Sequence, residues 1–445
     1  MSGTTATPEG TKVRSSLARV VGVPGAVLMG LGSILGTGIF VSIGIAAGVT
    51  GPSVVLAVAL AAAVAAFNGL SSAELAASHP VSGGTYEYGY RYLNPTLGFT
   101  AGWMFLSAKS ASAATAALGF AGYVLSALGV STGVLRVALA LAGILVLTAI
   151  VAGGMSRSNR ANTFIVVLTL LVLFGFVAIG LSSALGGAGT HLAAFFAGNG
   201  RGASGFFHAT ALMFVAYTGY GRIATLGEEI RDPQKSIPKA IVITLLCTMA
   251  IYAAVAFVAV AVVGAEGLAA ATEQAAAPLE VVARGFELPG VAWLVAAGAV
   301  TAMLGVLLNL LLGLSRVVLA MARRGDMPSA LARVNTKHSS PRAAVVVVGL
   351  IIAGLAATGS VKTTWSFSAF TVLVYYAITN LAALRLPPEA RLYPSWIPGL
   401  GLFCCLGLAF WVEPRIWASG LGLIAIGLIW HRIARRCAPA RDAGA

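Results

Sequence analysis

The chain has 445 residues, of which 58% are hydrophobic and 9% are charged. A soluble domain carries roughly 25% charged residues, so the composition excludes an ordinary globular protein. The net charge of +14 would suit a nucleic-acid partner, but the basic residues are dispersed over the polar connections and form no single patch, so we expect no nucleic-acid binding.

The apolar residues form runs long enough to cross a membrane as helices. A helix of about 20 apolar residues crosses ~30 Å of hydrocarbon, and the run at 54–67 has no period of two, which excludes strands of the outer-membrane type. We therefore expect an all-α integral membrane protein with twelve transmembrane helices. Their expected ranges are 22–49, 53–78, 95–129, 133–152, 161–184, 205–229, 238–264, 290–322, 342–359, 364–385, 396–412 and 416–431.

The basic residues favour one side of the membrane. If the first helix leaves the cytoplasm, twenty lysines and arginines fall in the inner connections and tails. Five fall in the outer connections, namely Arg136, Arg201, Arg284, Lys362 and Arg415. Because cytoplasmic loops carry the excess of Lys and Arg, we expect both termini in the cytoplasm and a multi-pass protein of the cell (inner or plasma) membrane, whose lipid bilayer surrounds it.

The first hydrophobic segment is interrupted by glycines. It carries GSILGTGIF at 32–40, where Gly36, Thr37 and Gly38 fall midway along the apolar run. Glycine in a helix interior costs about 1 kcal/mol relative to alanine, and unwound backbone is tolerated at membrane depth only where it lines a cavity or is buried in protein. Unwinding here would expose the N–H groups that begin the second half-helix, at Thr37 and Gly38, and this positive end of a helix dipole favours a carboxylate.

The third hydrophobic segment contains a lysine near mid-membrane. Lys109 lies about fourteen residues into this helix, or ~20 Å from its expected cytoplasmic start. A charged residue at this depth costs several kcal/mol unless it is paired, hydrated or neutralised, which makes it a functional candidate. We expect Lys109 to load and release a proton during transport. The alternative is a structural lysine that snorkels along a tilted helix or pairs with a carboxylate.

The sixth hydrophobic segment repeats the interruption in FVAYTGYGRIATLGEE, which begins at Phe214 and includes Gly219 and Gly221. Carbonyls freed near Ile34 in the first segment, and near Phe214 and Ala216 in the sixth, would accept hydrogen bonds from an ammonium group. Since α-amino acids carry both a carboxylate and an ammonium group, they are the expected substrate class.

Two interruptions that lie five helices apart indicate inverted five-helix repeats with a binding site between them. Close packing of small residues between helices is the alternative reason for glycine at these positions. The matched placement of the two interruptions favours the binding site.

The polar stretches leave no room for a soluble domain. The longest of them, 265–289 and 323–341, are too short to form a core. We expect one transmembrane domain at 22–431, between a cytoplasmic N-terminal tail at 1–21 and a cytoplasmic C-terminal tail at 432–445. The first of the two long stretches is expected to form a short surface helix over the extracellular entrance.

Four blocks of the sequence resemble the amino acid, polyamine and organocation permeases, and the resemblance covers nearly the whole chain. These blocks are GSILGTGIF at 32–40, SSAELAASHPVSGGTYEYGY at 71–90, FVAYTGYGRIATLGEEIRDPQKSIPKAI at 214–241 and SRVVLAMARRGDMP at 315–328. The sixth-helix block is most similar to the cationic and broad-range amino acid permeases, with paired Glu228 and Glu229 followed by Asp232 and Pro233.

The resemblance implies the five-plus-five inverted-repeat fold of the sodium-coupled leucine transporter type. Repeat one would span 22–184 and repeat two 205–385, with two additional C-terminal helices at 396–431. It also implies recognition of the substrate at Ile34, Gly36, Thr37, Gly38, Phe214, Ala216, Tyr217 and Gly219, where Tyr217 stands at the position of an aromatic gate.

The sequence departs from this family in the fifth helix. Proton-coupled relatives often carry a lysine there in place of a sodium ion, and Thr169 stands at what resembles that position. Lys109 would replace the missing charge from the third helix, or Thr169 and Thr301 would contribute oxygens to a sodium site. An uncoupled exchanger is the third alternative.

A second departure is Arg222, which stands near a position where many relatives have an acidic residue. With Lys109 it would make the cavity more positive, which argues against dibasic substrates and polyamines unless an acid such as Glu74 compensates. The alternative is that Arg222 pairs with Glu228 or Glu229.

These observations predict a secondary active transporter of amino acids that works by alternating access, as a proton-coupled symporter with no cofactor and no metal site; sodium is the other candidate coupling ion. The alternatives are an amino acid exchanger, a transporter of an organic amine, and a nutrient receptor that does not transport. The chain has no HExxH motif, nucleophile elbow or catalytic carboxylate cluster, so we expect no enzyme. One asymmetric pair of broken helices also does not suit a channel.

Overall fold

The computed structural model describes residues 21–79, 83–130, 133–154, 159–193, 202–224, 230–334 and 341–437. Within these ranges the chain is helical almost throughout, and its β-type pairing is an isolated parallel bridge between Val21 and Ile230. The expected all-α class is confirmed.

Eight stretches of the described chain are long and apolar enough to cross a membrane. They are Gly38–Ser78, which includes α2 (Ile43–Thr50) and α3 (Val54–Ser78), then α5 (Pro95–Ala127), α6 (Gly133–Ala152), α7 (Asn159–His191), α10 (Pro233–Ala275), α12 (Val291–Arg324), α14 (Val361–Leu384) and α16 (Pro414–Cys437). Three apolar helices are shorter, namely α1 (Val23–Ile34), α13 (Arg342–Ala356) and α15 (Trp396–Ala409).

Two of the long helices, α5 and α14, begin at a side-chain cap. Asn94 precedes α5, and its side chain accepts a 2.8 Å hydrogen bond from the Leu97 N–H, while proline at the first position, Pro95, needs no partner for a backbone N–H. Ser360 caps α14 in the same way through the N–H of Thr363, at 3.2 Å. Side-chain caps of this kind satisfy N–H groups that have no partner within the helix.

The seventh helix begins earlier than expected. α10 starts at Pro233 and contains Pro238, the residue at which the sequence predicted its start, so that prediction is wrong. Pro238 is only the sixth residue of the helix, in its second turn, where its missing N–H removes a single backbone hydrogen bond, to the carbonyl of Gln234. At its other end α10 leaves helical geometry at Gly264, with φ +72°, and resumes to Ala275.

The stretch between α10 and α12 also forms a short helix, α11 (Pro278–Arg284). Together with the end of α10 after Gly264, it confirms the short helix expected in this connection. The sequence did not predict α4 (Thr85–Tyr92), a short helix between α3 and α5.

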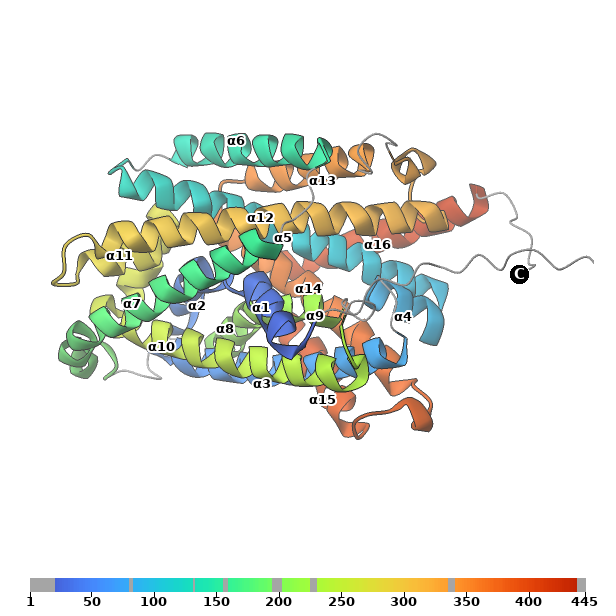
Figure 1. The fold of residues 1–445 in the computed structure, drawn as a ribbon, viewed down its shortest axis with the longest axis horizontal. Helices are drawn as coiled ribbons and strands as arrows, with labels where there is room; N and C mark the ends of the chain where they lie inside the picture. Colours follow the sequence, from blue (N-terminus) through green and yellow to red (C-terminus); the bar gives the residue numbers. More distant parts are fainter. Residues whose placement is uncertain are drawn as a thin grey trace, which may run out of the picture.

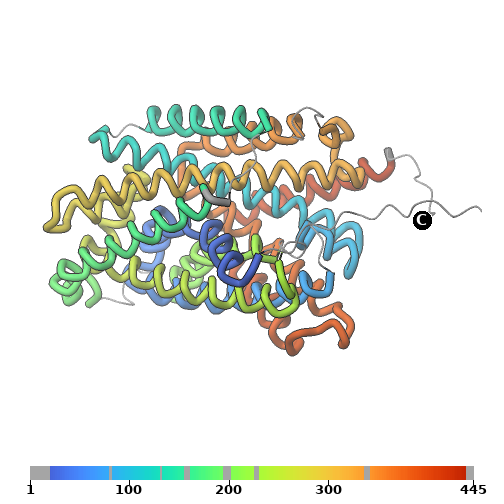
Figure 2. The backbone as a smooth tube through the Cα atoms, in the orientation of Figure 1, coloured from blue at the N-terminus to red at the C-terminus, as the bar shows by residue number. Residues whose placement is uncertain are grey.

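The long helices lie side by side along one direction of the molecule (Figure 1). The short helices α1, α2 and α8 (Gly202–Tyr217) occupy the middle of the bundle, as the backbone trace in Figure 2 also shows. There α8 packs against α2, α3 and α14, and α10 packs against α1, α2 and α3. At one edge α6 and α13 pack against each other.

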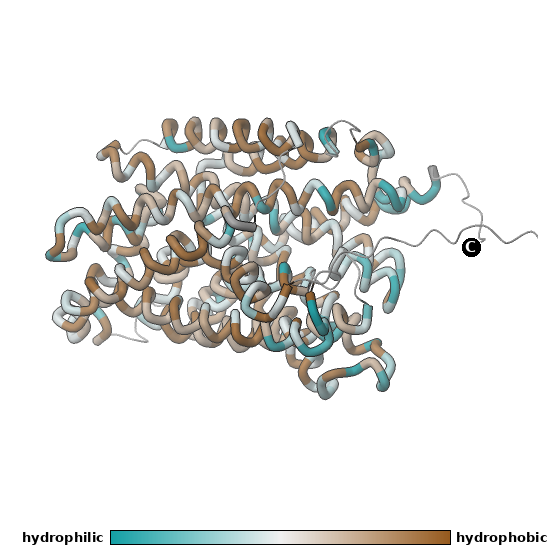
Figure 3. The backbone as a smooth tube through the Cα atoms, viewed as in Figure 1, coloured by the Kyte–Doolittle hydropathy of each residue, from teal (hydrophilic) through white to brown (hydrophobic). Residues whose placement is uncertain are grey.

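Large apolar side chains cover the outside of the bundle. Leu145 on α6 is 70% exposed, Phe164 on α7 is 68% exposed and Phe403 on α15 is 74% exposed. Apolar residues dominate the middle of the long helices, and hydrophilic ones gather toward the ends, most densely near α4 (Figure 3). An apolar surface of this extent in a bundle of spanning length suits contact with lipid. The protein is therefore an integral membrane protein.

A buried polar cluster joins α4, the end of α12 and α16. The carboxylate of Asp326, just after α12, accepts hydrogen bonds from the hydroxyls of Tyr86 at 2.6 Å and Tyr90 at 2.7 Å. The His431 ring nitrogen of α16 lies 3.2 Å from the same carboxylate, and Arg324 lies over the Tyr90 ring, 4.2 Å from its centroid. Burial raises the pKa of both tyrosines, so both hydroxyls remain hydrogen-bond donors at neutral pH.

Candidate functional site

The first apolar helix is broken where its glycines predict. α1 ends at Ile34, Leu35 has extended geometry, and the chain resumes as the π-helix η1 (Gly38–Ser42), which leads into α2. The N–H groups of Ile39 and Phe40 both donate to the carbonyl of Gly36, at 3.1 Å. The N–H groups before them begin a new helix and have no intrahelical acceptor.

The hydroxyl of Thr37 lies at this break. Its side chain is only 4% exposed, and its Oγ1 has no hydrogen-bond partner among the described residues. Since buried polar atoms are almost always paired, this oxygen is suited to a polar ligand.

The sixth apolar segment is broken as well, but by tighter winding. α8 ends at Tyr217, the 3₁₀ turn η4 (Thr218–Tyr220) follows, and α9 (Gly221–Ala224) continues the segment. A 3₁₀ turn within a helix marks a local hinge and changes which carbonyls are paired. The residues from Thr225 to Glu229, including the proposed acidic pair, lie outside the described part of the chain.

The two breaks touch each other, which explains two of the glycines. A Cβ added at Gly219 would lie 2.4 Å from the carbonyl oxygen of Ser33 in α1. A Cβ added at Gly38 would lie 2.8 Å from the Ala216 side chain and 2.7 Å from the hydroxyl of Tyr252. Only glycine allows this approach of the two backbones.

Tyr252 joins the two broken helices through their carbonyls. Its hydroxyl, from the middle of α10, donates to the Ile34 carbonyl at 2.9 Å and lies 3.4 Å from the Ala216 carbonyl. The carbonyls of Ile34 and Ala216 were both predicted as acceptors for a substrate ammonium group. The structure directs them toward one donor atom, although they lie far apart in the sequence.

Sequence reasoning missed Tyr252. A signal was present, because a tyrosine amid the apolar seventh segment needs a hydrogen-bond partner for its hydroxyl when it is buried. The side chain is fully buried.

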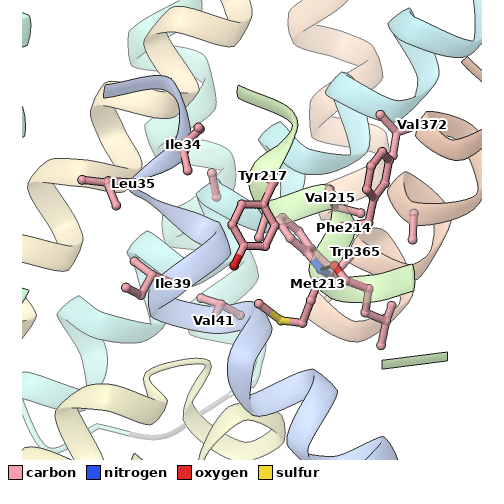
Figure 4. Close-up of a cluster of buried hydrophobic side chains, with 14 of the residues drawn as sticks. Ile34, Leu35, Ile39, Val41, Met213, Phe214, Val215, Tyr217, Trp365 and Val372 are labelled. Carbon is pink, nitrogen blue, oxygen red and sulfur yellow. Dashed lines mark hydrogen bonds between the residues drawn. The ribbon is translucent and has the colours of Figure 1, made fainter. Parts of the chain in front are cut away.

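Aromatic side chains enclose the break in α8. Tyr217 is fully buried, lies between η1 and α8 (Figure 4), and donates to the Val58 carbonyl of α3 at 3.2 Å. The Phe214 ring packs edge-on against Tyr376 of α14, and Trp365 of α14 donates to the Leu212 carbonyl at 2.9 Å. These contacts hold α8 against α3 on one side and α14 on the other.

Lys109 reaches this site from α5. Its Nζ donates a 2.7 Å hydrogen bond to the hydroxyl of Thr218, the first residue of η4, and Thr218 in turn donates to the Val215 carbonyl at 2.7 Å. The lysine is partly exposed. The mid-membrane lysine is thus in contact with the broken part of the sixth segment.

A tyrosine of α5 connects the other side of the site to α11. The Tyr123 hydroxyl donates to the Phe40 carbonyl of η1 at 2.7 Å and accepts from the Leu279 N–H of α11 at 3.2 Å. The next residue of α11, Glu280, is buried and accepts from the Ser126 hydroxyl at 2.7 Å. The π-helix of the site and the short helix α11 are therefore linked through one side chain.

The other predicted site residues take separate positions. Thr169 on α7 donates to the Ile165 carbonyl, and Thr301 on α12 donates to the Ala297 carbonyl, each at 2.7 Å within its own helix. The Glu74 carboxylate accepts from the Leu392 N–H at 3.4 Å, so it faces the connection between α14 and α15.

Arg222 is the second residue of α9 and is partly exposed. Gly36 lies in the first break, and a Cβ there would lie 2.6 Å from a methyl group of Val306 on α12. The structure therefore brings together Ile34, Gly36, Thr37, Gly38, Phe214, Ala216, Tyr217, Gly219 and Lys109 around the two breaks.

An all-helical membrane bundle with two broken helices in contact at its centre defines a membrane transport protein. The chain belongs to the family described as amino acid permease, whose profile matches residues 25–433. It is a transporter and not an enzyme.

Curated relatives agree with this family. The chain is 40% identical to an uncharacterized transporter of Mycobacterium tuberculosis, over 97% of this chain and 96% of the relative. It is 30% identical to a branched-chain amino acid permease of Bacillus subtilis, over 89% of each. It is 31% identical to cationic amino acid transporter 4 of Homo sapiens, over 85% of this chain and 61% of that protein. The expected resemblance to amino acid permeases is confirmed.

Proposed function

We propose that the protein carries α-amino acids across the cell membrane by alternating access, as a proton-coupled symporter. One observation carries this proposal: the carbonyls of Ile34 and Ala216, from two different broken helices, converge on the single hydroxyl of Tyr252. An ammonium group has three N–H donors and no acceptor, so it can replace the hydroxyl and bond both carbonyls.

The carboxylate of the same substrate has a partner beside these carbonyls. The start of η1 presents N–H groups without intrahelical acceptors and the positive end of a helix dipole. Gly38 lies next to Ala216, since a Cβ on Gly38 would lie within 3 Å of it. The hydroxyl of Thr37 supplies a further donor, because it is buried and has no partner among the described residues. The two charged ends of an amino acid thus fit one break each.

We propose twelve crossings arranged as two inverted repeats with two additional helices, and the helix lengths support the number of crossings. Gly38–Ser78 has 41 residues, which as one straight helix would extend ~60 Å, about twice the hydrocarbon thickness of ~30 Å. Gly51, with φ +73°, separates α2 from α3 within this stretch. We assign it to two crossings, the first shared with α1.

The charge pattern supports an orientation with both termini in the cytoplasm. α4 and the last turn of α16 lie toward one end of the bundle and α11 toward the other (Figure 1). The end near α4 carries Arg91, Arg324, Arg435 and Arg436. Because basic residues are retained inside, we place this end in the cytoplasm of the cell and α11 outside.

The burial pattern supports access to the site from the α9 side. Lys109, Gly219, Gly221 and Arg222 are partly exposed, whereas Ile39, Phe40, Phe214 and Tyr217 are buried. We therefore assign Tyr217 to a barrier on the outer side of the site, where it would act as the aromatic gate. Alternating access would require this barrier to open while the α9 side closes.

We propose Lys109 as the proton-carrying residue. Thr169, at the position of the lysine in proton-coupled relatives, is uncharged and bonded within its own helix. Lys109 contacts the broken sixth segment directly, and an ionisable group inside a membrane bundle is a candidate proton relay. Proton loading on Lys109 would then be coupled to substrate binding at the breaks.

Purified protein in liposomes tests both parts of the proposal. We expect saturable amino acid uptake that is accelerated by an inward proton gradient and unaffected by sodium. The corresponding decarboxylated amine should not compete, because it lacks the carboxylate. Binding without flux would indicate a receptor. Uptake that occurs only when the liposomes contain amino acid, which leaves in return, would indicate an exchanger.

A lysine variant tests the coupling. Lys109→Ala should abolish the stimulation by the proton gradient. Proton-driven uptake with an unchanged pH profile in this variant would contradict the role of Lys109. Lys362→Ala is the matched control, since Lys362 lies on the surface of α14, 3.7 Å from Glu413.

A further inference from the structure

Lys109 has unused hydrogen-bonding capacity at the site. A lysine ammonium has three donors and no acceptor. One of these donors is directed at the Thr218 hydroxyl, at 2.7 Å. Within the described ranges, no carboxylate lies in salt-bridge range of Lys109.

Two buried carboxylates of the described chain have side-chain partners. Glu280 accepts from Arg284 at 2.7 Å, and Asp326 accepts from Tyr86 at 2.6 Å. A buried charge without a counter-charge is strongly destabilising, which is why such charges pair with one another. Lys109 differs from Glu280, because its contact in the described chain is a neutral hydroxyl.

The position of the ammonium group adjoins the proposed amino-group subsite. Lys109 bonds Thr218, and Thr218 bonds the Val215 carbonyl at 2.7 Å. The next carbonyl of the same helix end, that of Ala216, is the proposed acceptor for the substrate ammonium. Successive carbonyls of a helix are about 100° apart around its axis, so the Lys109 contact and the amino-group subsite lie on adjacent sides of the end of α8.

A substrate can reach this position. Both Lys109 and Gly219 are partly exposed. The side chain of an amino acid bound at the two breaks would lie close to Thr218, since Thr218 is two residues from Ala216 at the end of α8.

We propose that Lys109 and Thr218 form the side-chain subsite of the transporter and that its preferred substrates are α-amino acids with an anionic side chain. This inference rests on the proposed function. The side-chain carboxylate supplies the counter-charge that the described chain does not, and the Thr218 hydroxyl orients the ammonium toward it. A monoanionic amino acid carries one net negative charge, and protonated Lys109 carries one positive charge. The pair is neutral, so the substrate and the proton on Lys109 stabilise each other in the site.

The pair glutamate and glutamine tests the inference, because the two have nearly the same shape and differ in charge. In the unmutated full chain, reconstituted at neutral pH, we expect glutamate to inhibit uptake roughly 10- to 100-fold more strongly than glutamine, as for a hydrogen bond to a charged group. Equal or stronger inhibition by glutamine, leucine or arginine would overturn the inference.

Variants of Lys109 test whether this residue causes the preference for glutamate over glutamine. Lys109→Gln should remove the preference for glutamate while glutamine still binds, and Lys109→Arg should keep it. Lys362→Gln is the control and should change nothing. A Lys109→Gln protein that binds glutamine and still prefers glutamate would also overturn the inference.

Two further outcomes keep this test distinct from that of the proposed function. If leucine or arginine is transported and glutamate is not, only the side-chain subsite is wrong. If no amino acid is bound or transported by the intact protein, the proposed function itself fails. If the Lys109→Gln protein does not fold, the comparison of glutamate with glutamine in the unmutated protein still tests the side-chain subsite.

Discussion

The Tyr252 hydroxyl donates a 2.9 Å hydrogen bond to the Ile34 carbonyl, although 218 positions separate the two residues in the sequence. The bond ties the middle of α10 to the end of α1 at the first break. Because the same hydroxyl lies 3.4 Å from the Ala216 carbonyl, one side chain stabilises both breaks at the point where the substrate ammonium is proposed to bind.

Tyr252→Phe tests whether this hydroxyl and the substrate use the same carbonyls. Removing it takes a donor from the Ile34 and Ala216 carbonyls, and leaving a buried carbonyl unsatisfied costs about 1–3 kcal/mol. We expect a lower Tm without substrate and a larger rise of Tm on adding a transported amino acid, because the substrate ammonium restores the bonds. Thermal unfolding in detergent measures both.

Tyr393→Phe is the control for this experiment, since Tyr393 lies outside the membrane-spanning helices, in the connection before α15. A Tyr252→Phe protein whose Tm rises no more with substrate than that of the unmutated protein would contradict a shared site.

Gly219→Ala tests the contact between the two breaks. The added methyl group would lie 2.4 Å from the Ser33 carbonyl oxygen, so the backbones of α1 and η4 must separate. We expect uptake to fall at least tenfold while the protein still reaches the membrane. Uptake by vesicles, normalised to the amount of protein, provides the measurement.

Gly313→Ala is the matched control, because a Cβ at Gly313 in α12 meets nothing within 4 Å. It should retain uptake and gain up to about 1 kcal/mol of stability from the better helix propensity of alanine. Equal uptake by both alanine variants would argue against the contact.

Tyr123→Phe tests the link between the site and α11. The variant loses the donor to the Phe40 carbonyl and the acceptor for the Leu279 N–H. We expect faster amide hydrogen exchange in residues 278–284 and a reduced rate of uptake, with α4 unaffected. Unchanged exchange in α11 would show that its other contacts, such as Ser126 with Glu280, are sufficient to hold it.

Asp326→Ala tests the polar cluster at the opposite end. The change removes the acceptor of two tyrosine hydroxyls, and hydrogen bonds to a charged group contribute about 1.5–3 kcal/mol each. We expect a clearly lower Tm. Glu389→Ala, at an exposed position, should leave the Tm unchanged.

Alkaline pH should weaken the same cluster. The pKa of Tyr86 and that of Tyr90 are raised by burial and by their hydrogen bonds to Asp326. A group whose pKa is raised on folding contributes stability that is fully present below its unfolded pKa, about 10 for tyrosine, and is lost as pH rises above that value. The drop of Tm above pH 10 should therefore be smaller in Tyr86→Phe than in the unmutated protein.

Local features of the sequence predicted the class of the protein and the location of its breaks. The lengths of the apolar runs predicted membrane-spanning helices, and the glycines near Gly36 and Gly219 predicted where two of them are interrupted. The first break is a π-helix and the second a 3₁₀ turn, and this difference was not predicted, because hydrogen-bond register within a break depends on what packs against it.

The start of α10 shows the limit of local signals. Pro238 was predicted to begin the seventh helix, yet Pro233 begins it and Pro238 is tolerated five residues further on. Both prolines are followed by residues that continue a helix, so the sequence alone does not distinguish them.

The sequence by itself determined that the chain is a helical membrane transporter and predicted two glycine-rich breaks in its helices. These are properties of short segments, since hydrophobic length and the backbone freedom of glycine act locally. Only the tertiary structure decided that Gly219 lies against Ser33, that Tyr252 joins Ile34 to Ala216, and that Lys109 reaches Thr218. Each of these contacts joins different helices, and their geometry depends on how the whole bundle packs.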